Sequence, residues 1–403
     1  MIKTRKKSIL FLLLITLILI TILFNIVLFF KLPSPDYEYR QLALPDNFSL
    51  PDARIIAIGT ATHGNAEPYD VVIEMLQKIK EKRGRVAFVL EEETGDSVLI
   101  NHNHSYFDNE RKELIGTYTV YNNSEMDRLL SWVKSEDVNF YGIDIKFIRP
   151  LVEIVKNFLN DKGYLDINID QLRSNANLKY EMQIKEKIIE KIENIMNELL
   201  KSKSIEEREF DYISHIINCI RMNYKFVLGG KQNNVRDQMM AENVLWVMEH
   251  ELKYYNNENI LLFAHNGHII EDGYNFVNNI DIQYITMGHH LSVDLGDDYY
   301  SIVTEAKKNS FLAVDNIRSD KRKLFSIERK GSLIDIIGVE SPSIKFCTSE
   351  YLKQAGISVW NLTVIGSYFD KMRTFKPEEY TINTNIETCF DSMLYYDQLT
   401  PNN

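Results

Sequence analysis

A short apolar run that stops at two histidines is the feature that most constrains this chain. Residues 260–263 read Ile-Leu-Leu-Phe, are bounded by polar residues and are short enough to form a buried strand. His265-Asn266-Gly267-His268 follows almost at once, and an Asn-Gly pair favours a tight turn. In an open α/β sheet, ligands bind in the crevice outside the carboxyl ends of the strands. The run therefore predicts a buried strand with a candidate site at its end.

The same layout occurs near the start of the chain. Residues 55–59 read Ile-Ile-Ala-Ile-Gly and lead to Thr60-Ala61-Thr62-His63-Gly64. A histidine beside glycine, just past a strand, is suited to proton transfer near neutral pH, although His63 alone also fits a structural histidine in a loop. Glu67 lies four residues further on and faces the same way if a helix has begun. We expect the two strand ends to form facing halves of one site.

Strands and helical segments alternate over the first part of the chain. Residues 86–90 and 138–145 are predicted strands, and helical periodicity covers residues 69–82 and 124–134. This alternation predicts an α/β fold with a mainly parallel central sheet and flanking helices. Further along, several short strands are expected, among them 299–304 and 311–314 as two separate strands.

The pattern changes between residues 151 and 230. Apolar residues there recur at helical spacing with Lys and Glu between them, and no convincing strand is present. The segment is therefore a predicted helical insert at about 151–230 that caps the crevice, and a coiled-coil partner site is the alternative interpretation.

Carboxylates stand at the end of the predicted strand 86–90. Glu91 leaves a buried run, so burial raises its pKa unless a cation or a histidine pairs with it. Glu92 and Glu93 follow directly, which leaves the choice among the three open.

His265 and His268 have two alternative uses. Their spacing fits a metal pair, with Glu91 or Asp144 as a third ligand, but the pattern is much less specific than H-E-x-x-H on a helix. The alternative is metal-free catalysis, in which one histidine is a base and another donates to a developing oxyanion. His289 and His290 are further candidates, of which we expect at most one near the site.

Several function classes lack their usual sequence carriers. The chain has no Gly-x-Ser-x-Gly elbow, P-loop or Gly-x-Gly-x-x-Gly motif. Residues 1–31 carry five cations and no acid, so the formal net charge of −11 leaves −16 on residues 32–403. Such an acidic body gives no support to nucleic-acid binding. The three cysteines are too few for a disulfide framework and are expected to be buried apolar residues.

The N-terminal segment has the character of a membrane anchor. Residues 8–30 carry no charge, and a helix of this length can cross a hydrocarbon core of about 30 Å. The cations before it place the N-terminus in the cytoplasm. We predict a cytoplasmic tip and transmembrane signal anchor at residues 1–33, a tether at 34–52 and an extracytoplasmic domain at 53–403, in a single-pass protein of the cell membrane. A cleaved signal peptide is the alternative.

Seven short blocks, in this order, resemble the erythromycin esterase family. The resemblance covers roughly residues 50–398. The blocks are Ile58–Gly64 with Glu67, Phe88–Glu91, Tyr141–Asp144, Arg236-Asp237 with Met240, Ala241 and Asn243, Ala264–His268, Met287-Gly288 with Leu291, and the segment around Asp391.

The resemblance implies an α/β body with a helical cap over a deep cleft, and hydrolysis of an ester, which is a macrolide lactone in the best-known members. It implies that His63 is the general base that activates water and that Glu91 orients His63. His265 and His268 would polarise the carbonyl group or protonate the leaving alkoxide, with Glu67 as a further catalytic candidate. Asp144, Arg236, Asn266 and His289 are assigned to substrate binding. No cofactor is predicted, although some relatives with a similar fold use a divalent metal.

One departure from the family pattern keeps two functions open. The family's first block usually reads Gly-Glu-x-x-His-Gly, and Thr60 occupies the position of the glutamate. The first hypothesis is a membrane-anchored extracytoplasmic hydrolase of a small-molecule or polymer ester, in which Glu67 can replace the missing carboxylate. The alternative is a catalytically impaired surface module that binds an envelope glycan or an acylated polymer.

Overall fold

The computed structural model describes residues 16, 42–95, 97, 123–175, 178–273, 284–315, 322–329 and 344–402. Residues 8–30, for which a membrane span is predicted, lie outside this set apart from Thr16, as does the first part of the predicted tether. Among the residues that are described, no helix has the length and apolar character needed to cross a bilayer.

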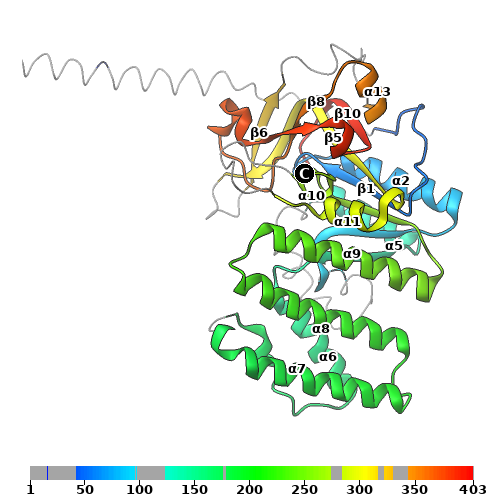
Figure 1. Ribbon diagram of the computed structural model, residues 1–403, viewed down its shortest axis with the longest axis vertical. Coiled ribbons are helices and arrows are strands. Elements are labelled where there is room, and N and C mark those ends of the chain that lie inside the picture. The colour runs from blue at the N-terminus through cyan, green and yellow to red at the C-terminus, as the bar shows by residue number, and fades with distance from the viewer. Residues whose placement is uncertain are drawn as a thin grey trace, which may run out of the picture. The chain divides into compact units, whose positions relative to one another are not determined.

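A mixed sheet forms the centre of the described body (Figure 1). The pairs along β3, β2, β4, β1, β5 and β10 are all parallel, whereas β7 and β6 pair antiparallel with β10 and β5. The predicted α/β fold with a mainly parallel sheet is therefore confirmed. The strand order is β3 (Asn139–Asp144), β2 (Ala87–Glu93), β4 (Ile260–His265), β1 (Ile55–Thr60), β5 (Tyr299–Val314), β10 (Ser392–Leu399) and β7 (Ile344–Thr348), with β6 (Arg322–Glu328) beside β5.

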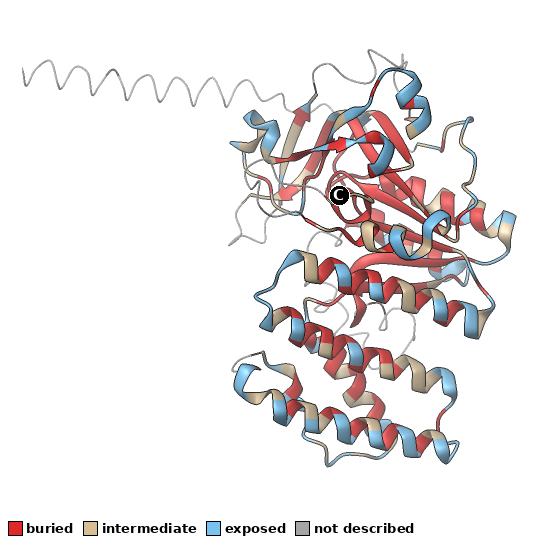
Figure 2. Ribbon diagram, in the orientation of Figure 1, coloured by how far each residue is buried: buried red, intermediate tan, exposed pale blue. Residues whose placement is uncertain are grey.

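Helices cover both faces of this sheet, so its strands β1, β2, β3 and β4 are almost wholly buried (Figure 2). Alternate residues of a strand point to opposite faces. Ile55 accordingly packs in one core with α9 (Asn233–Tyr255) and α11 (Met287–Leu295). Ile56 packs in the other core with α2 (Glu67–Arg83) and α5 (Ser124–Ser135). Burial on both faces explains why the strands read as continuous apolar runs.

The segment predicted as a helical insert is helical. It consists of α6 (Ile148–Asp161), the short helix η2 (Ile169–Arg173), α7 (Leu178–Lys201) and α8 (Glu207–Leu228). These helices share an apolar core of their own and stack beyond α9, away from the sheet (Figure 1). Its role as a cap over a crevice stays a prediction.

Residues 299–314 form one strand, so the prediction of two separate strands is wrong. The polar residues Lys307–Ser310 interrupt the apolar pattern, yet their backbone groups pair with β6 on one side and β10 on the other. Strand pairing over these residues comes from partners distant in sequence, which local periodicity does not reveal.

The three cysteines, Cys219, Cys347 and Cys389, are buried and form no disulfide, as expected.

Smaller elements complete the described body. The remaining elements are α10 (Asn266–Ile269), η3 (Gly296–Asp298), α13 (Ser349–Gln354), β8 (Val359–Thr363), η4 (Arg373–Phe375), η5 (Pro377–Glu379), β9 (Thr381–Asn385) and α14 (Ile386–Cys389).

Candidate active site

The end of β4 fixes the first histidine in one orientation. His265 caps α10, and its Nδ1 accepts a hydrogen bond of 3.2 Å from the backbone N–H of Gly267. Its Nε2 lies 3.3 Å from the carbonyl oxygen of Ala61, to which it therefore donates. Burial lowers the pKa of His265 to about 3, so the ring is neutral. Both ring nitrogens thus hold the protein's own backbone.

Asn266 joins the strands around the site. Its Nδ2 donates to the carbonyl oxygens of Thr304 (2.8 Å) and Thr363 (3.1 Å), and its Oδ1 accepts from the Thr304 backbone N–H. A Cβ added at Gly59 would lie 2.3 Å from Asn266 Oδ1, so β1 can pass here only with glycine. These contacts give Asn266 a positioning part, and substrate binding by this residue stays a prediction.

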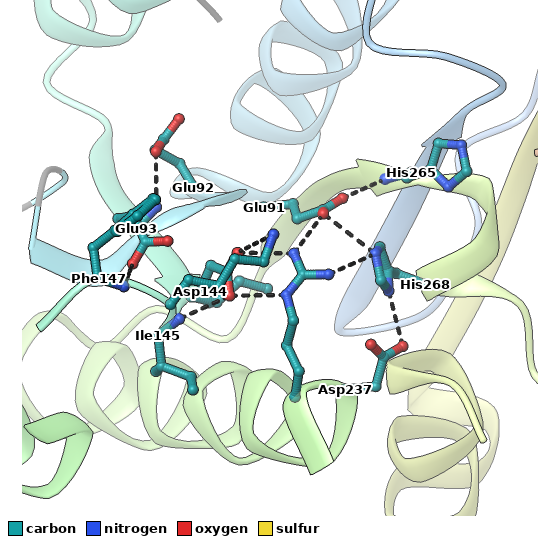
Figure 3. A network of polar contacts seen from close by, with 12 residues as sticks. Glu91, Glu92, Glu93, Asp144, Ile145, Phe147, Asp237, His265 and His268 are labelled. Atoms are coloured by element: carbon teal, nitrogen blue, oxygen red, sulfur yellow. Dashed lines mark hydrogen bonds and ion pairs between the residues drawn. The ribbon is translucent and has the colours of Figure 1, made fainter. Parts of the chain in front are cut away.

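Arg236 on α9 is the centre of a buried charged network, of which Glu91, Asp144 and His268 are labelled in Figure 3. Its Nη2 donates to Glu91 Oε1 and to Asp144 Oδ2, both at 2.8 Å, and its Nε donates to Asp144 Oδ1 at 3.0 Å. Its Nη1 lies 3.1 Å from Nε2 of His268. The guanidinium therefore ties together the ends of β2 and β3. Its predicted contact with substrate stays a prediction.

His268 lies between two carboxylates. Its Nδ1 is 2.9 Å from Asp237 Oδ2, and its Nε2 is 3.3 Å from Glu91 Oε1. Asp237 is held in turn by the Tyr284 hydroxyl (2.8 Å) and the backbone N–H of Met287 (2.9 Å). Burial lowers the pKa of His268, but the two carboxylates outweigh this and raise the pKa to about 9. His268 is therefore an imidazolium at neutral pH.

The carboxylates beside Arg236 are ionised. Burial raises the pKa of Glu91, but His268 and Arg236 outweigh it and hold this pKa well below its usual value. Glu91 Oε2 also accepts a hydrogen bond of 2.9 Å from the backbone N–H of His265. Burial likewise opposes ionisation of Asp144, and Arg236 and Lys146 lower its pKa in spite of it. The network therefore holds alternating charges that compensate one another.

Glu93 is the exception in this network. It is buried, and its Oε2 accepts a hydrogen bond of 3.0 Å from the backbone N–H of Phe147. Its Oε1 has no hydrogen-bond partner among the residues described. Burial and the neighbouring Asp144 charge raise the pKa of Glu93 well above its usual value, so its carboxyl group is neutral.

His63 is the more open histidine of the site. It is half-buried, and its ring centroid lies 5.4 Å from that of His265. Its surroundings lower the pKa of His63 to about 4, with desolvation as the main cause and Glu91 acting in the opposite direction. The structure thus brings His63, Glu91, His265, His268, Asp144 and Arg236 together, as expected for facing strand ends.

Glu67 lies in a different set of contacts. Its carboxylate accepts hydrogen bonds from the Thr400 backbone N–H (2.9 Å) and the Thr400 hydroxyl (2.6 Å). Burial raises the pKa of Glu67 to about 7. Beside it, Asn402 Nδ2 donates to the carbonyl oxygen of His63 at 2.9 Å. Glu67 therefore anchors the segment 400–402 that holds the backbone of His63, and its catalytic role stays a prediction.

Two further predicted positions have other partners. His289 Nδ1 lies 2.8 Å from the carbonyl oxygen of Glu271. Thr60, in place of the family's glutamate, pairs with His265 in the sheet, and its hydroxyl donates to the Thr62 carbonyl oxygen at 2.6 Å. Substrate binding by His289 stays a prediction.

Sequence reasoning missed two members of the network, Asp237 and Lys146. Asp237 directly follows Arg236 in one of the family-like blocks, but no feature of the neighbouring sequence shows that it contacts His268. Lys146 Nζ lies 3.2 Å from Asp144 Oδ2, and a lone lysine after a strand carries no signal. Over the described ranges, no group of three or more His, Cys, Asp or Glu side chains is placed to hold a metal ion.

This arrangement supplies the parts of a general base site. His63 is neutral and reachable, so it can accept a proton from water. Glu91 is ionised nearby and favours the imidazolium that would then form. The buried network fixes Glu91 from three directions, which pre-organises its charge.

Comparison with solved structures shows the same fold at low sequence identity. A Bacillus cereus protein superposes with a TM-score of 0.68 and 18% identity over 86% of this chain and 89% of its own. A succinoglycan biosynthesis protein gives 0.63 and 16% identity over 87% and 89%. A mutant of the erythromycin esterase EreC in its open conformation gives 0.60 and 15% identity over 87% and 92%.

Sequence comparison identifies the family. No curated protein matches the chain significantly. The sequence profile of the erythromycin esterases matches residues 80–397, which include Glu91, Asp144, Arg236 and both histidines of the β4 end. The resemblance drawn from the short blocks is thereby confirmed, and the chain belongs to the erythromycin esterase family.

Proposed function

We propose that this protein hydrolyses a carboxylic ester, with His63 as the general base. The family and the fold support a hydrolase, and the observation that carries the finer proposal is the half-buried, neutral His63 beside the ionised Glu91. Small-molecule esters, macrolide lactones among them, are the first substrates to test, and a polymer ester is the alternative.

The proposed reaction begins with proton transfer from water to the ring of His63. The water oxygen attacks the ester carbonyl carbon, and the resulting imidazolium is stabilised by the negative charge of Glu91. Collapse of the tetrahedral intermediate breaks the bond to the alkoxide, which takes the proton back from His63. The products are a carboxylic acid and an alcohol.

Substitution of His63 tests this proposal. In the full chain, His63→Ala is expected to lower kcat about 10²–10⁴-fold toward aryl esters or macrolides, the usual contribution of a general base. His290→Ala is the control, because His290 is a partly exposed histidine of α11 whose described ring contact is with His289. Turnover that survives His63→Ala unchanged contradicts the proposal.

Binding without hydrolysis is the second candidate function. Thr60 favours it, because its hydroxyl cannot take up a proton as the usual glutamate can, and it already donates to Thr62. Saturable binding of an envelope glycan or acylated polymer that persists in a His63→Ala, His265→Ala double variant supports this function. Turnover of any ester by the native chain, lost in that variant, counts against it.

We further propose that the chain is anchored in the cell membrane through residues 8–30, with its folded domain outside the cytoplasm. The uncharged run preceded by cations supports this orientation. The protein should then be recovered in the membrane fraction. In a separate test, protease added to intact cells should degrade its folded domain. Protection in intact cells, with degradation only after lysis, contradicts the orientation.

A further inference from the structure

The charged network of the site is largely buried among the described residues, with one member much more exposed than the rest. The side chains of Asp144, Arg236 and Glu91 are at most 6% exposed. The side chain of Lys146, which pairs with Asp144 at 3.2 Å, is 30% exposed. Among the described residues, Lys146 is therefore the charged side chain of the network that is most open to a ligand.

The second cation, Arg236, is committed to the protein itself. Its Nε and Nη2 donate three hydrogen bonds of 2.8–3.0 Å to the carboxylates of Asp144 and Glu91. Turning Arg236 toward a ligand would take this partner away from buried carboxylates, which costs free energy. An ammonium on a flexible stem is different, because it can turn toward a ligand while Asp144 keeps its two bonds from Arg236.

Lys146 belongs to the same site as His63. Lys146 follows β3, whose last residue, Asp144, is linked through Arg236 to Glu91. The positive charge of Lys146 acts on His63 and contributes to the lowered pKa of that ring. A substrate whose ester bond lies against His63 therefore lies within the field of Lys146.

From this geometry we infer that Lys146 makes the site selective for esters that carry an anionic group, such as a carboxylate, near the scissile bond. The inference rests on the proposed hydrolysis at His63. The rest of residues 32–403 is strongly acidic and repels anions, so such a substrate needs a local cation. A charge-assisted hydrogen bond from Lys146 supplies it.

A pair of esters of equal acyl length tests the inference. The full chain is assayed with para-nitrophenyl butyrate, which is neutral, and para-nitrophenyl hydrogen succinate, which ends in a carboxylate. The native protein should prefer the succinate, and Lys146→Gln should lower the succinate-to-butyrate ratio of kcat/KM about 10–100-fold, as expected for loss of one hydrogen bond to a charged group. Lys146→Arg keeps the charge and should keep most of the ratio.

Lys156→Gln is the matched control. Lys156 is also about one-third exposed, at 32%, and also pairs with one carboxylate, Asp170 at 3.1 Å, but it lies on α6 in the helical insert. Its substitution should leave the ratio unchanged. Equal loss of activity on both esters in Lys146→Gln, or no preference in the native protein, overturns the inference.

Binding of uncleavable amides separates this inference from the proposed hydrolysis. Calorimetry compares N-(para-nitrophenyl)succinamate with N-(para-nitrophenyl)butanamide. If no ester is cleaved but the native chain binds the succinamate more tightly and Lys146→Gln abolishes the difference, the proposed hydrolysis fails and the anion selectivity stands. If neither amide is bound more tightly than the other, the selectivity fails.

Discussion

Buried histidines in two groups have opposite charge states: His268 alone in the first, and the stacked pair His215 and His250 in the second. His268 lies between the carboxylates of Asp237 and Glu91, and its pKa is raised to about 9. His215 on α8 and His250 on α9 instead stack against Trp246, with ring centroids 3.6 Å and 4.7 Å from it. The pKa values of these two histidines are lowered by burial to about 3 and about 4.

The difference shows what decides the charge of a buried histidine. Burial disfavours the imidazolium in both groups, by the same physical effect. At His268, contact with the carboxylates of Asp237 and Glu91 reverses it, and His268 and Arg236 in turn lower the pKa of Glu91. The stacked group packs α8 of the helical insert against α9, whereas the site holds buried ion pairs near His63.

Removal of Arg236 should have the largest effect on this contrast. Arg236→Met removes the cation that the buried carboxylates Glu91 and Asp144 share, which should lower the free energy of unfolding by about 3–5 kcal/mol. Hydrolysis at His63 should be lost as well. Unfolding by denaturant measures the change in stability.

Arg221→Met is the matched control for Arg236→Met. Arg221 also binds two carboxylates, Glu186 and Glu193, both at 2.6 Å, but at the partly exposed surface of the insert. Its loss should cost about 1 kcal/mol or less. Equal losses in the two variants would contradict the view that burial makes the network of Arg236 critical.

The raised pKa of His268 predicts a loss of stability at alkaline pH. The folded protein holds this proton up to pH of about 9, whereas an unfolded histidine releases it near its ordinary pKa of about 6.5. The stabilisation is therefore complete below the lower value and is lost as the pH rises through the higher, by about 3 kcal/mol. Free energies of unfolding at neutral pH and above pH 9 measure it.

Asp237→Asn sharpens this test, because it removes one of the two carboxylates that hold the proton of His268. In this variant the alkaline loss of stability should be smaller and should begin at lower pH. An alkaline profile that matches that of the native protein would show that His268 is not the group responsible.

The stacked histidines predict a smaller effect on the acid side. Their folded pKa values lie below the unfolded value, so the unfolded chain binds protons first and stability falls as the pH drops below about 6.5. His215→Phe keeps a ring against Trp246 and removes one such group. Between pH 6.5 and 5 it should lessen the acid loss of stability by about 1–2 kcal/mol. An unchanged acid profile would contradict a neutral His215 in the native protein.

Much of the fold could be predicted from the sequence, because its signals are local. Apolar runs such as 55–59 and 260–263 determine buried strands, and the helical periodicity of 151–230 determines α6 to α8. The candidate site followed in part, since parallel strands bring His63, Glu91 and His265 to the same edge of the sheet. The single long strand β5 could not be predicted, because its pairing partners are distant in sequence.

The sequence by itself determined the family, the sheet and which strand ends carry chemistry. Only the tertiary structure decided that Arg236 binds two buried carboxylates, that Asp237 contacts His268 and that Glu67 binds Thr400. It also decided that Lys146 is the most exposed cation of the described network. The reason is physical. The character of a strand depends on neighbours along the chain, whereas the charge and reach of a side chain depend on groups that folding brings from elsewhere.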